Sequence, residues 1–308
     1  MAKYLVTGGA GFIGCNLVRF LLDKGHDAVV LDNFSTGRQE NLTDVADRIE
    51  LIDGDIRDRA AVDRAVAGCA AVFHQAALGS VPRSVDDPVT THDVNATGTV
   101  AVLRRVVYAA SSSAYGDQPR SPKHEDMAPL PMSPYAASKL AGEAYMQGYA
   151  GVFSMETLSL RYFNVFGPFQ DPHAAYAAVI PAFVARLLAG EPPIVFGDGE
   201  QTRDFCYVDN ACEANWLAAQ APADVCDGRA LNIACGASTS LNRILRRLRT
   251  RYPARRCPPD RKCWCARTCR RSSAGIVAAA LRRDDDSVNF RSRGDGYFLS
   301  LARSVRTP

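Results

Sequence analysis

A glycine-rich turn near the N-terminus constrains the fold more than any other feature of this sequence. Residues 4–14 read YLVTGGAGFIG, so a short apolar run leads directly into Gly9-x-Gly11-x-x-Gly14. The apolar residues after the turn recur at helical spacing as far as Gly25. Strand, glycine turn and helix in this order are typical of a dinucleotide-binding unit, because glycines let the backbone turn tightly and approach a pyrophosphate. An ordinary glycine-rich turn is the weaker interpretation, since both flanking elements match.

Strand-like and helix-like segments continue to alternate beyond this turn. The next expected strands lie at residues 27–33, 48–56, 70–77, 104–112 and 155–167. Strands that alternate with helices form βαβ units and a parallel sheet. The sequence therefore predicts an α/β fold, namely a Rossmann-type doubly wound parallel sheet with a smaller C-terminal α/β substrate lobe.

One crossover of this sheet is expected to be short. The helix that begins near Asp93 runs almost directly into the strand at 104–112 and has room for only about ten residues. Parallel strands need a crossover of roughly a dozen residues or more, with a loop at each end of its helix. We expect a shortened, strained connection in a sheet that still closes.

The composition favours a globular chain with no membrane-spanning segment. The chain has 308 residues, of which 47% are apolar, enough for a substantial core. No apolar run approaches the ~18 residues that a membrane span needs. Met1-Ala2-Lys3 leads straight into the first strand rather than into a signal-like segment. We expect a cytoplasmic protein with no membrane partner.

The cysteine pattern argues against a metal site. Six of the ten cysteines are scattered, mostly within apolar patterns, and are interpreted as small core residues. The other four are close together at Cys257, Cys263, Cys265 and Cys269. Their spacing, C-x5-C-x-C-x3-C, matches no standard zinc ligand set, and no histidine follows it. No metal is expected.

An aspartate at the end of the second strand indicates which dinucleotide would bind. Asp32 stands 18 residues after Gly14. A carboxylate there accepts a hydrogen bond from a ribose 2′-hydroxyl and repels a 2′-phosphate, so NAD is favoured over NADP. Asp55 and Ile56 follow the next strand and are candidates to border the adenine, although a plain loop fits their spacing nearly as well. The turn itself contributes the expected cofactor contacts at Gly8, Gly11, Phe12, Ile13 and Gly14.

A tyrosine and a lysine with helical spacing form the candidate catalytic pair. The segment SPYAASK places Tyr135 four positions before Lys139, which is one helical turn on the same face. Tyrosine in water titrates near pH ~10, and a neighbouring cation lowers that pKa by favouring the phenolate. Ser111 and Ser112 follow a strand, at the edge where parallel sheets bind ligands, so a serine hydroxyl can share a proton with Tyr135. Tyr-x-x-x-Lys alone is common by chance, but the glycine turn and the serines make chance the poorer explanation.

Six motifs spread over residues 3–242 occur together in one known family. They read TGGAGFIG, HQAALGSVPRS, SSSAYGD, SPYAASK, LRYFNVFGP and GDGEQTRDFCYVDN. As a set they resemble the extended short-chain dehydrogenase/reductase family, and more narrowly its nucleotide-sugar 4-epimerases. The HQAALGSVPRS segment and the stretch from RYFNVFG to AYAAVIP most resemble the UDP-N-acetylglucosamine 4-epimerases.

The resemblance implies 4-epimerisation of a UDP-sugar on tightly held NAD, through a transient 4-keto sugar. Tyr135 would take the proton of the sugar 4-hydroxyl while C4 passes a hydride to the nicotinamide, and the hydride would return to the other face of the sugar. Ser111, with Ser112 beside it, would help to move the proton. Lys139 would lower the pKa of Tyr135 and hold the nicotinamide ribose.

Further site residues follow from the same motif matching. Cofactor contacts are implied at Asn33, Ala76, Ala77, Asn95 and Tyr162, and substrate contacts at Ser80, Ser111, Asn164, Val179 and Arg203. Arg203 suits a diphosphate because a guanidinium binds it bidentately, while an exposed salt-bridging arginine is the ordinary alternative. Relatives are often homodimers, built on a four-helix contact that includes the helix of Tyr135.

The motifs divide the chain into three expected regions. Residues 1–165 are the expected NAD-binding Rossmann domain. Residues 166–242 are the expected substrate lobe for the UDP-sugar, made of interleaved segments. Residues 243–308 form an atypical Arg- and Cys-rich tail.

The tail departs from the family pattern. Residues 1–242 carry 18 basic and 28 acidic side chains, whereas residues 243–308 carry 18 basic and only 5 acidic ones. The tail has little helical or strand periodicity, and the break in composition suggests coding sequence read in a shifted frame. A basic tail can bind nucleic acid, but it contains no recognisable motif, so no nucleic-acid partner is expected.

Several functions stay open at this level. Sugar 4,6-dehydratases of the family need an Asp-Glu pair where this chain has Ser112-Ser113-Ala114, so epimerisation is favoured over elimination. UDP-glucose 4-epimerase and UDP-glucuronate epimerase or decarboxylase are the alternative enzymes. An inactive, NAD-binding remnant is the alternative of another class, because the tail replaces part of the family's substrate site.

Overall fold

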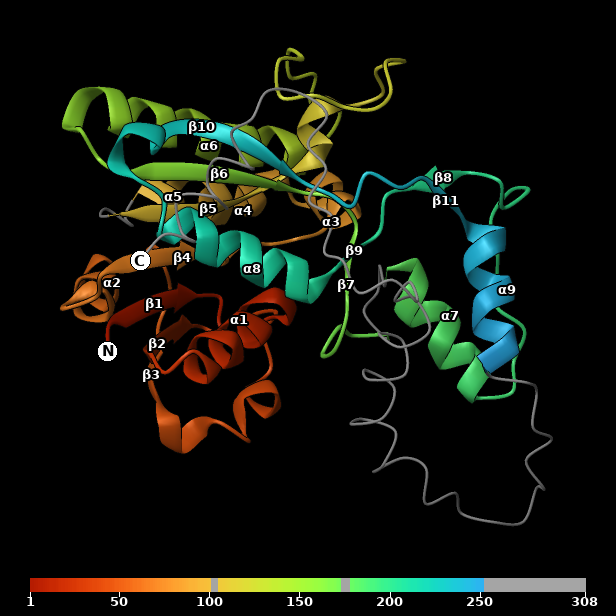
Figure 1. Cartoon of the computed structure of the whole chain (residues 1–308), viewed down its shortest axis with the longest axis horizontal. Coiled ribbons are helices and arrows are strands. Elements are labelled where there is room, and N and C mark those ends of the chain that lie inside the picture. Colours follow the sequence, from red (N-terminus) through yellow and green to blue (C-terminus); the bar gives the residue numbers. More distant parts are fainter. Residues whose placement is uncertain (101–104, 173–177, 252–308) are drawn as a thin grey trace. The chain divides into compact units, whose positions relative to one another are not determined.

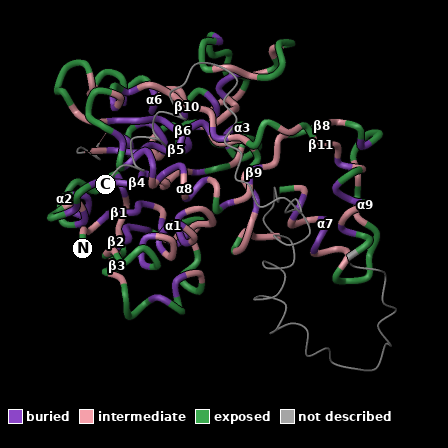
Figure 2. Tube along the Cα trace, viewed as in Figure 1, coloured by how far each residue is buried: buried purple, intermediate pink, exposed green. Residues whose placement is uncertain are grey.

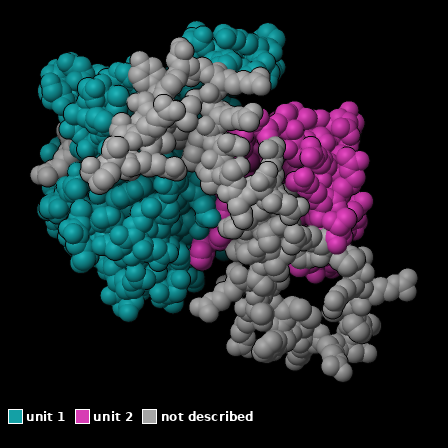
Figure 3. Space-filling model, viewed as in Figure 1, with its two compact units in different colours: residues 1–163, 209–233, 292–308 teal, residues 164–208, 234–291 magenta. Residues whose placement is uncertain are grey.

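The computed structural model describes residues 1–100, 105–172 and 178–251 (Figure 1). Within these residues the chain forms two compact units, coloured separately in Figure 3. Of the described residues, unit 1 takes 1–163 and 209–233, and unit 2 takes 164–208 and 234–251. The expected boundary near 165 lies close to the observed one. Residues 209–233, expected in the substrate lobe, instead return to unit 1.

Unit 1 is built on a seven-stranded sheet in which every pairing is parallel. The strand order reverses around the first strand, as in a doubly wound sheet, which confirms the predicted fold class. In sheet order the strands are β10 (Asp227–Ile233), β6 (Thr157–Tyr162), β5 (Val106–Ser111), β4 (Ala71–His74), β1 (Lys3–Thr7), β2 (Asp27–Asp32) and β3 (Ile49–Asp53).

Helices cover both faces of this sheet. One face packs against α2 (Arg59–Val66) and α6 (Pro134–Phe153), through a buried cluster that includes Leu5, Val72 and Met146. Side chains alternate along a strand, so the neighbouring Tyr4 points to the other face, where its ring contacts Trp216 of α8 (Val208–Ala219). The remaining helices of the unit are α1 (Phe12–Asp23), α3 (Val81–Asp86), α4 (Pro88–His92) and α5 (Gly98–Val100). In Figure 2 the buried residues follow the central strands.

The crossover between β4 and β5 is described as far as Val100 and again from Arg105. The segment Asp93–Thr97 is π-helical and continues α4 directly into α5, whose described residues are Gly98–Val100. β5 begins at Val106 and pairs with Val72 of β4, so the sheet closes despite the short connection.

Unit 2 holds two small sheets and two helices within the described residues. β7 (Val165–Phe166) pairs in parallel with β9 (Cys206–Tyr207), and β8 (Thr202–Arg203) pairs antiparallel with β11 (Thr239–Ser240). The helices are α7 (Val179–Leu188) and α9 (Leu241–Arg251). They share a core with Phe166, made of Ile180, Phe183, Val184, Ile244, Leu245 and Leu248.

Helix α9 corrects one sequence expectation. The sequence predicts a loss of periodicity directly after residue 242, yet the helix runs to Arg251. Leu241, Ile244 and Leu248 are buried at helical spacing, while Arg246 and most other arginines of the helix lie on its exposed side. The density of arginine concealed a regular amphipathic pattern. The clustered cysteines and the rest of the tail lie outside the described residues.

No helix in the described part of the chain is long and apolar enough to span a membrane.

Candidate active site

The glycine turn forms a cradle that side chains would fill. Gly8 has φ +68°, and a Cβ there would stand 2.7 Å from the backbone nitrogen of Ala76. A Cβ at Gly14 would overlap the carbonyl oxygen of Gly8. Gly11 donates to that same carbonyl at 3.0 Å and stands at the N-cap of α1, which Phe12 begins. The free N–H groups and positive potential of the first turn of α1 therefore lie beside a backbone that only glycine can form.

Asp32 closes this cradle from the end of β2. Its carboxylate accepts from the backbone nitrogens of Ala10 (2.9 Å) and Phe34 (2.8 Å), and the residue is only 7% exposed. Burial raises the pKa of Asp32, and the two backbone hydrogen bonds partly oppose that rise. The carboxylate is thus held against the glycine turn, as its sequence position predicts.

The residues after β2 and β3 form a polar network. Asn33 donates to Asp55 at 2.8 Å, and Arg57 binds Asp55 at 2.8 Å and Asp93 at 2.6 Å. The hydrogen bonds from Arg57 lower the pKa of Asp55 to about 2. Of the two adenine candidates, Asp55 carries a polar side chain, whereas the apolar side chain of Ile56 is buried.

The structure brings Tyr135 and Ser111 together. Ser111 ends β5, and its side chain comes close enough to Tyr135, near the start of α6, to act on the pKa of the phenol. Ser113 donates its hydroxyl to Ser111 at 2.8 Å, which extends the chain of hydroxyls. Ser112 begins the 3-10 turn Ser112–Tyr115, and it is Ser111, rather than Ser112, that meets Tyr135.

The charge environment of Tyr135 differs from the sequence expectation. Burial raises the pKa of Tyr135, and the Ser111 side chain only partly lowers it. Lys139 is buried one turn later, where its ammonium donates to the backbone oxygen of Ala109 at 2.8 Å. Burial lowers the pKa of Lys139 to about 8. Burial and Ser111 thus set the direction of the Tyr135 pKa, and the lowering expected from Lys139 is not observed.

Asn95 lies behind the site rather than on its surface. It is 1% exposed, accepts from the nitrogen of Leu78 at 2.7 Å, and donates to Ser138 at 3.0 Å. Ser138 in turn donates to the carbonyl of Tyr135 at 2.8 Å. Asn95 therefore supports the loop after β4, which contains Ala76 and Ala77, and the turn of α6 that contains Tyr135.

The buried His74 links the hydrogen bonds around Asn95 to the strand that leads into the glycine turn. Thr99 donates to the Asn95 carbonyl at 2.7 Å, so its oxygen accepts from Nε2 of His74 at 2.9 Å. Nδ1 of His74 then accepts from the Thr7 hydroxyl at 2.7 Å. Burial lowers the pKa of His74 to about 3, so the ring is neutral and links Thr7, just before the turn, to the π-helical segment.

The end of β6 carries a second buried polar cluster. The hydroxyl of Tyr162 accepts from Asn215 at 2.7 Å and from Gln75 at 3.1 Å. Gln75 also donates to Asn215 at 3.0 Å, and Asn215 is fully buried. Tyr162 is therefore fixed by two amides from distant parts of the chain.

Helix α3 anchors the start of α6. Ser80 caps α3 by accepting from the nitrogen of Arg83 at 3.2 Å. Ser84 accepts from the backbone nitrogen of Tyr135 at 3.0 Å. Ser80 is thus observed in a helix cap, while Ser84 is a positioning contact that the sequence did not reveal.

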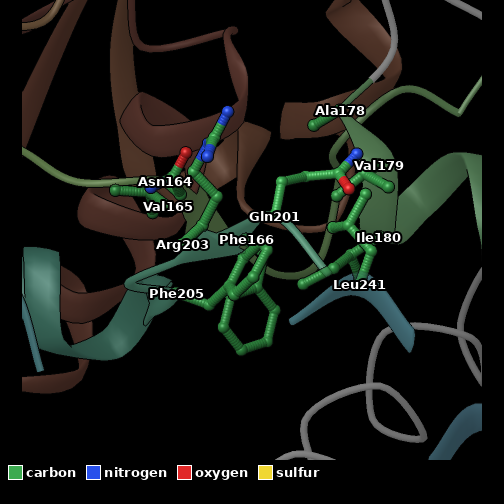
Figure 4. Close-up of a pocket in the computed structure, with 10 residues that line it drawn as sticks. All are labelled: Asn164, Val165, Phe166, Ala178, Val179, Ile180, Gln201, Arg203, Phe205 and Leu241. Carbon is green, nitrogen blue, oxygen red and sulfur yellow. The ribbon is translucent and has the colours of Figure 1, made fainter. Parts of the chain in front are cut away.

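Unit 2 contains a pocket of about 260 Å³ that includes three expected substrate residues (Figure 4). Asn164 donates to the carbonyl of Asp204 at 2.9 Å, and its backbone has φ +24°. Asn164 and Arg203 lie together on one side of the pocket, and Val179 lies on the other. The full lining is Asn164, Val165, Phe166, Ala178, Val179, Ile180, Gln201, Arg203, Phe205 and Leu241.

The sequence did not reveal Gln201, Phe205 and Leu241 as residues of this pocket. Phe205 and Gln201 flank Arg203 within the GDGEQTRDF motif, so their strand-like spacing of two from it was a usable clue. Leu241 gave no clue, because it stands where the sequence pattern of the family ends.

Comparison with known proteins identifies the family. Residues 4–234 match the NAD dependent epimerase/dehydratase family. The chain is 42% identical over 259 residues to UDP-glucose 4-epimerase of Mycolicibacterium smegmatis, covering 79% of this chain and 80% of the relative.

Solved structures agree with that match. UDP-N-acetylglucosamine 4-epimerase from Methanobrevibacter ruminantium M1, in complex with UDP-N-acetylmuramic acid, has 37% identity and a TM-score of 0.76, covering 81% of this chain and 82% of that one. UDP-glucose 4-epimerase of Thermus thermophilus, in complex with NAD, has 35% identity and a TM-score of 0.73, covering 82% of this chain and 84% of that one.

The residues of the cradle fit NAD. Gly8 and Gly14 leave the space that a Cβ would occupy, beside the open N-terminus of α1. Asp32 offers a carboxylate at the end of β2, where a 2′-phosphate would be repelled. The chain belongs to the NAD dependent epimerase/dehydratase family and is an NAD-dependent enzyme.

Proposed function

We propose that this chain catalyses 4-epimerisation of a UDP-sugar, and that its substrate pair is UDP-N-acetylglucosamine and UDP-N-acetylgalactosamine. The observation that carries the proposal is the meeting of three groups around the carboxyl end of β5. They are Ser111, which ends the strand, Tyr135, whose pKa the Ser111 side chain lowers, and buried Lys139, one helical turn after Tyr135. In a parallel sheet this edge is where ligands bind. Family membership supplies the reaction class.

Tyr135 and Ser111 move the proton in this proposal. The phenol oxygen of Tyr135 takes the proton of the sugar 4-hydroxyl as C4 becomes a carbonyl, and returns it when the C–H bond re-forms on the opposite face. Bound NAD supplies the hydride acceptor and donor for that carbon. Ser111, at the end of β5 near Tyr135, shares the proton, and Ser113 orients Ser111 through its own hydroxyl. The buried ammonium of Lys139 stabilises negative charge on Tyr135.

The cofactor is assigned to the cradle of unit 1. The turn and helix start that contain Gly8, Gly11, Phe12, Ile13 and Gly14 hold the pyrophosphate, and Asp32 with Asn33 holds the adenosine ribose. Further contacts come from Asp55, Ile56, Ala76, Ala77, Asn95, Lys139 and Tyr162. Asn95 acts through the loop that it supports, because its own amide is buried and bonded to Leu78 and Ser138.

The nucleotide of the substrate is assigned to the pocket of unit 2. Arg203 provides a guanidinium for the diphosphate, and Asn164 and Val179 hold the nucleoside together with Phe205. An aromatic ring among apolar residues with few polar groups is typical of a small-molecule site. Ser80, on the loop before α3, is proposed to contact the sugar.

The sequence around Ser111 favours epimerisation over elimination of water. Dehydration needs an acid and a base next to the reacting carbon, and the segment after Ser111 is Ser112-Ser113-Ala114-Tyr115. These side chains offer hydroxyl groups and no carboxyl group. An intermediate 4-keto sugar in this site would therefore be reduced again rather than dehydrated.

An assay on the purified chain tests the proposal. UDP-N-acetylglucosamine, UDP-glucose and UDP-glucuronate are offered separately without added NAD, and the C4 epimer is measured by chromatography. We expect conversion of the N-acetyl sugar by the wild type and none by Tyr135→Phe. Conversion of UDP-glucose alone would identify the alternative epimerase, for which the Mycolicibacterium smegmatis relative argues. Bound NAD with no conversion of any sugar would identify an inactive remnant.

A homodimer is also part of the proposal. Helix α6 exposes an apolar stripe, with Tyr145 43% exposed, Val152 75% and Phe153 65%, and neighbouring α4 exposes Val89 at 76%. Stripes of this kind are covered in helix-to-helix contacts between subunits. Light scattering should give twice the mass of the 33.3 kDa chain, and Val152→Glu should reduce it to a single copy.

A further inference from the structure

A buried ion pair lies one helical turn beyond the catalytic lysine. Arg161 of β6 donates to Glu143 of α6 through Nε at 2.9 Å and through Nη2 at 2.7 Å. Their side chains are only 5% and 4% exposed. Arg161 also stacks on Tyr115, with 4.7 Å between its guanidinium carbon and the ring centroid. Burying two charges is expensive, and a pair of this kind is weak evidence for stability, so its presence calls for another role.

Lys139 is a buried cation with no carboxylate in contact among the described residues. Its ammonium donates to the carbonyl of Ala109 and lies 5.1 Å from the ring centroid of Tyr108. Glu143 follows it by four positions on α6, so the two side chains share one face of the helix.

The other charged groups around Lys139 cannot balance it. His74 of β4 is neutral, and Tyr108 and Tyr135 are protonated phenols. On β10, exposed Asp227 pairs with Arg229. The short helices that contact α6 carry only surface charges, at Arg83, Asp86, Asp87, His92 and Asp93. Within the described chain, Asp32 is the other buried carboxylate, and it lies on β2, beyond β5, β4 and β1.

We infer that Glu143 is a positioning residue that keeps Lys139 charged, and that Arg161 holds the Glu143 carboxylate in place for this task. The inference rests on the proposed function, in which Lys139 acts beside Tyr135. Bidentate contact with Arg161 fixes both oxygens of Glu143, so the carboxylate cannot turn away to solvent. Burial lowers the pKa of Lys139 and the charge of Glu143 raises it again, in agreement with this role.

The consequence is a direct link between a structural ion pair and the pH range of catalysis. With Glu143 neutral, the ammonium of Lys139 loses its nearest counter-charge and gives up its proton at lower pH. Tyr135 would then have no cation beside it over part of the neutral range. The alkaline limb of the pH profile of kcat/KM therefore depends on the charge of Glu143, although Glu143 itself does not contact the substrate in this proposal.

Nuclear magnetic resonance of the lysine side chains tests this without requiring activity. The chain has only five lysines, at positions 3, 24, 123, 139 and 262, so labelled lysine gives few signals. The Lys139 signal is assigned by its absence in Lys139→Met. In Glu143→Gln we expect its titration midpoint to fall by on the order of one pH unit, as for the loss of one charge at a neighbouring helical position. Glu143→Asp should restore most of the shift.

Matched variants separate this role from a merely structural one. Asp63→Asn removes an exposed pair with Arg59 at the same helical spacing and should leave the Lys139 midpoint unchanged. If Glu143→Gln does not fold, Glu143→Gln combined with Arg161→Met is compared with Arg161→Met alone, so that the two variants differ only in the charge of Glu143, and the Arg161→Met midpoint then takes the place of the wild-type midpoint. A Lys139 midpoint equal to that of the wild type in the folded variant overturns the inference.

Activity then distinguishes this inference from the proposed function. The alkaline limb of kcat/KM for the epimerase should move to lower pH together with the Lys139 midpoint. If the midpoint falls but no UDP-sugar is converted even by the wild type, the link between Glu143 and Lys139 stands and the proposed function fails.

Discussion

Helix α6 contains three glycines whose replacement by alanine should have opposite effects. A Cβ at Gly142 would overlap the hydroxyl of Tyr108, whereas a Cβ at Gly148 or Gly151 would meet nothing within 4 Å. Tyr108 is fully buried in β5 and donates to the carbonyl of Lys139 at 3.3 Å, so its ring has no free space to move into. The three positions share one helix and differ in what stands opposite them.

The magnitudes follow from these contacts. Alanine in place of a helical glycine gains about 0.5–1 kcal/mol, because glycine loses more conformational freedom on folding. At Gly142 the overlap with Tyr108 costs about 1–3 kcal/mol as overpacking, and a displaced hydroxyl also loses about 1 kcal/mol of hydrogen bonding. Gly142→Ala should therefore lower the free energy of unfolding by about 1–3.5 kcal/mol, and Gly148→Ala should raise it by up to about 1 kcal/mol.

Urea unfolding at a fixed, saturating NAD concentration measures both effects, because bound cofactor stabilises every variant by the same mass action. Gly151→Ala is the second control and should behave like Gly148→Ala. Equal stabilisation at Gly142 and Gly148 would show that α6 does not lie as close to β5 as the structure has it. Unequal denaturant slopes would mean that a variant had changed its compactness, and then only the midpoints should be compared.

Three further predictions concern charge. Arg57 lowers the pKa of Asp55, so their pairing stabilises the fold at neutral pH by less than ~1 kcal/mol after solvent screening. This contribution should fade as the pH falls from about 4 towards 2. The difference in unfolding free energy between wild type and Arg57→Gln, measured against pH, checks this prediction. Asp32→Ser removes the group that repels a 2′-phosphate, so calorimetry should show the ratio of NAD to NADP affinity falling by at least about tenfold, which is ~1.4 kcal/mol. Arg203→Ala should raise KM for the UDP-sugar about 10- to 100-fold, the loss of one charge-assisted contact of ~1.5–3 kcal/mol, while NAD content stays unchanged.

The local parts of the fold and site were readable from the sequence. Each central strand is a short apolar run, and Asp32 is found at the expected strand end because strand, turn and helix lengths fix its distance from the glycines. The helical spacing of Tyr135 and Lys139 was also correct, since it depends only on α6 being a helix. The proximity of Ser111 to Tyr135 was expected because Ser111 ends a strand of the parallel sheet, at the edge where ligands bind, and Tyr135 lies near the start of the helix that follows.

The pKa directions of the site residues could not be predicted from the sequence in the same way. Burial decides the pKa direction of both Tyr135 and Lys139, and burial depends on what packs over them from elsewhere in the chain. His74 looked like part of an apolar strand, while its partners Thr7 and Thr99 are 67 and 25 residues away. Such contacts have no local pattern, because the chain brings them together only when the sheet forms.

Four contacts that the sequence does not predict share one role, which is to hold α6 in place. Ser84 binds its first turn, Asn95 reaches it through Ser138, Tyr108 donates to the carbonyl of Lys139, and Arg161 clamps the next turn through Glu143. These side chains come from four separate elements and act on successive turns of one helix. A reacting group must be held within a fraction of an ångström for efficient proton transfer, and one anchor cannot do that. The residues proposed to be catalytic can therefore be recognised from one short motif, whereas their positions depend on groups spread along the chain from Ser84 to Arg161.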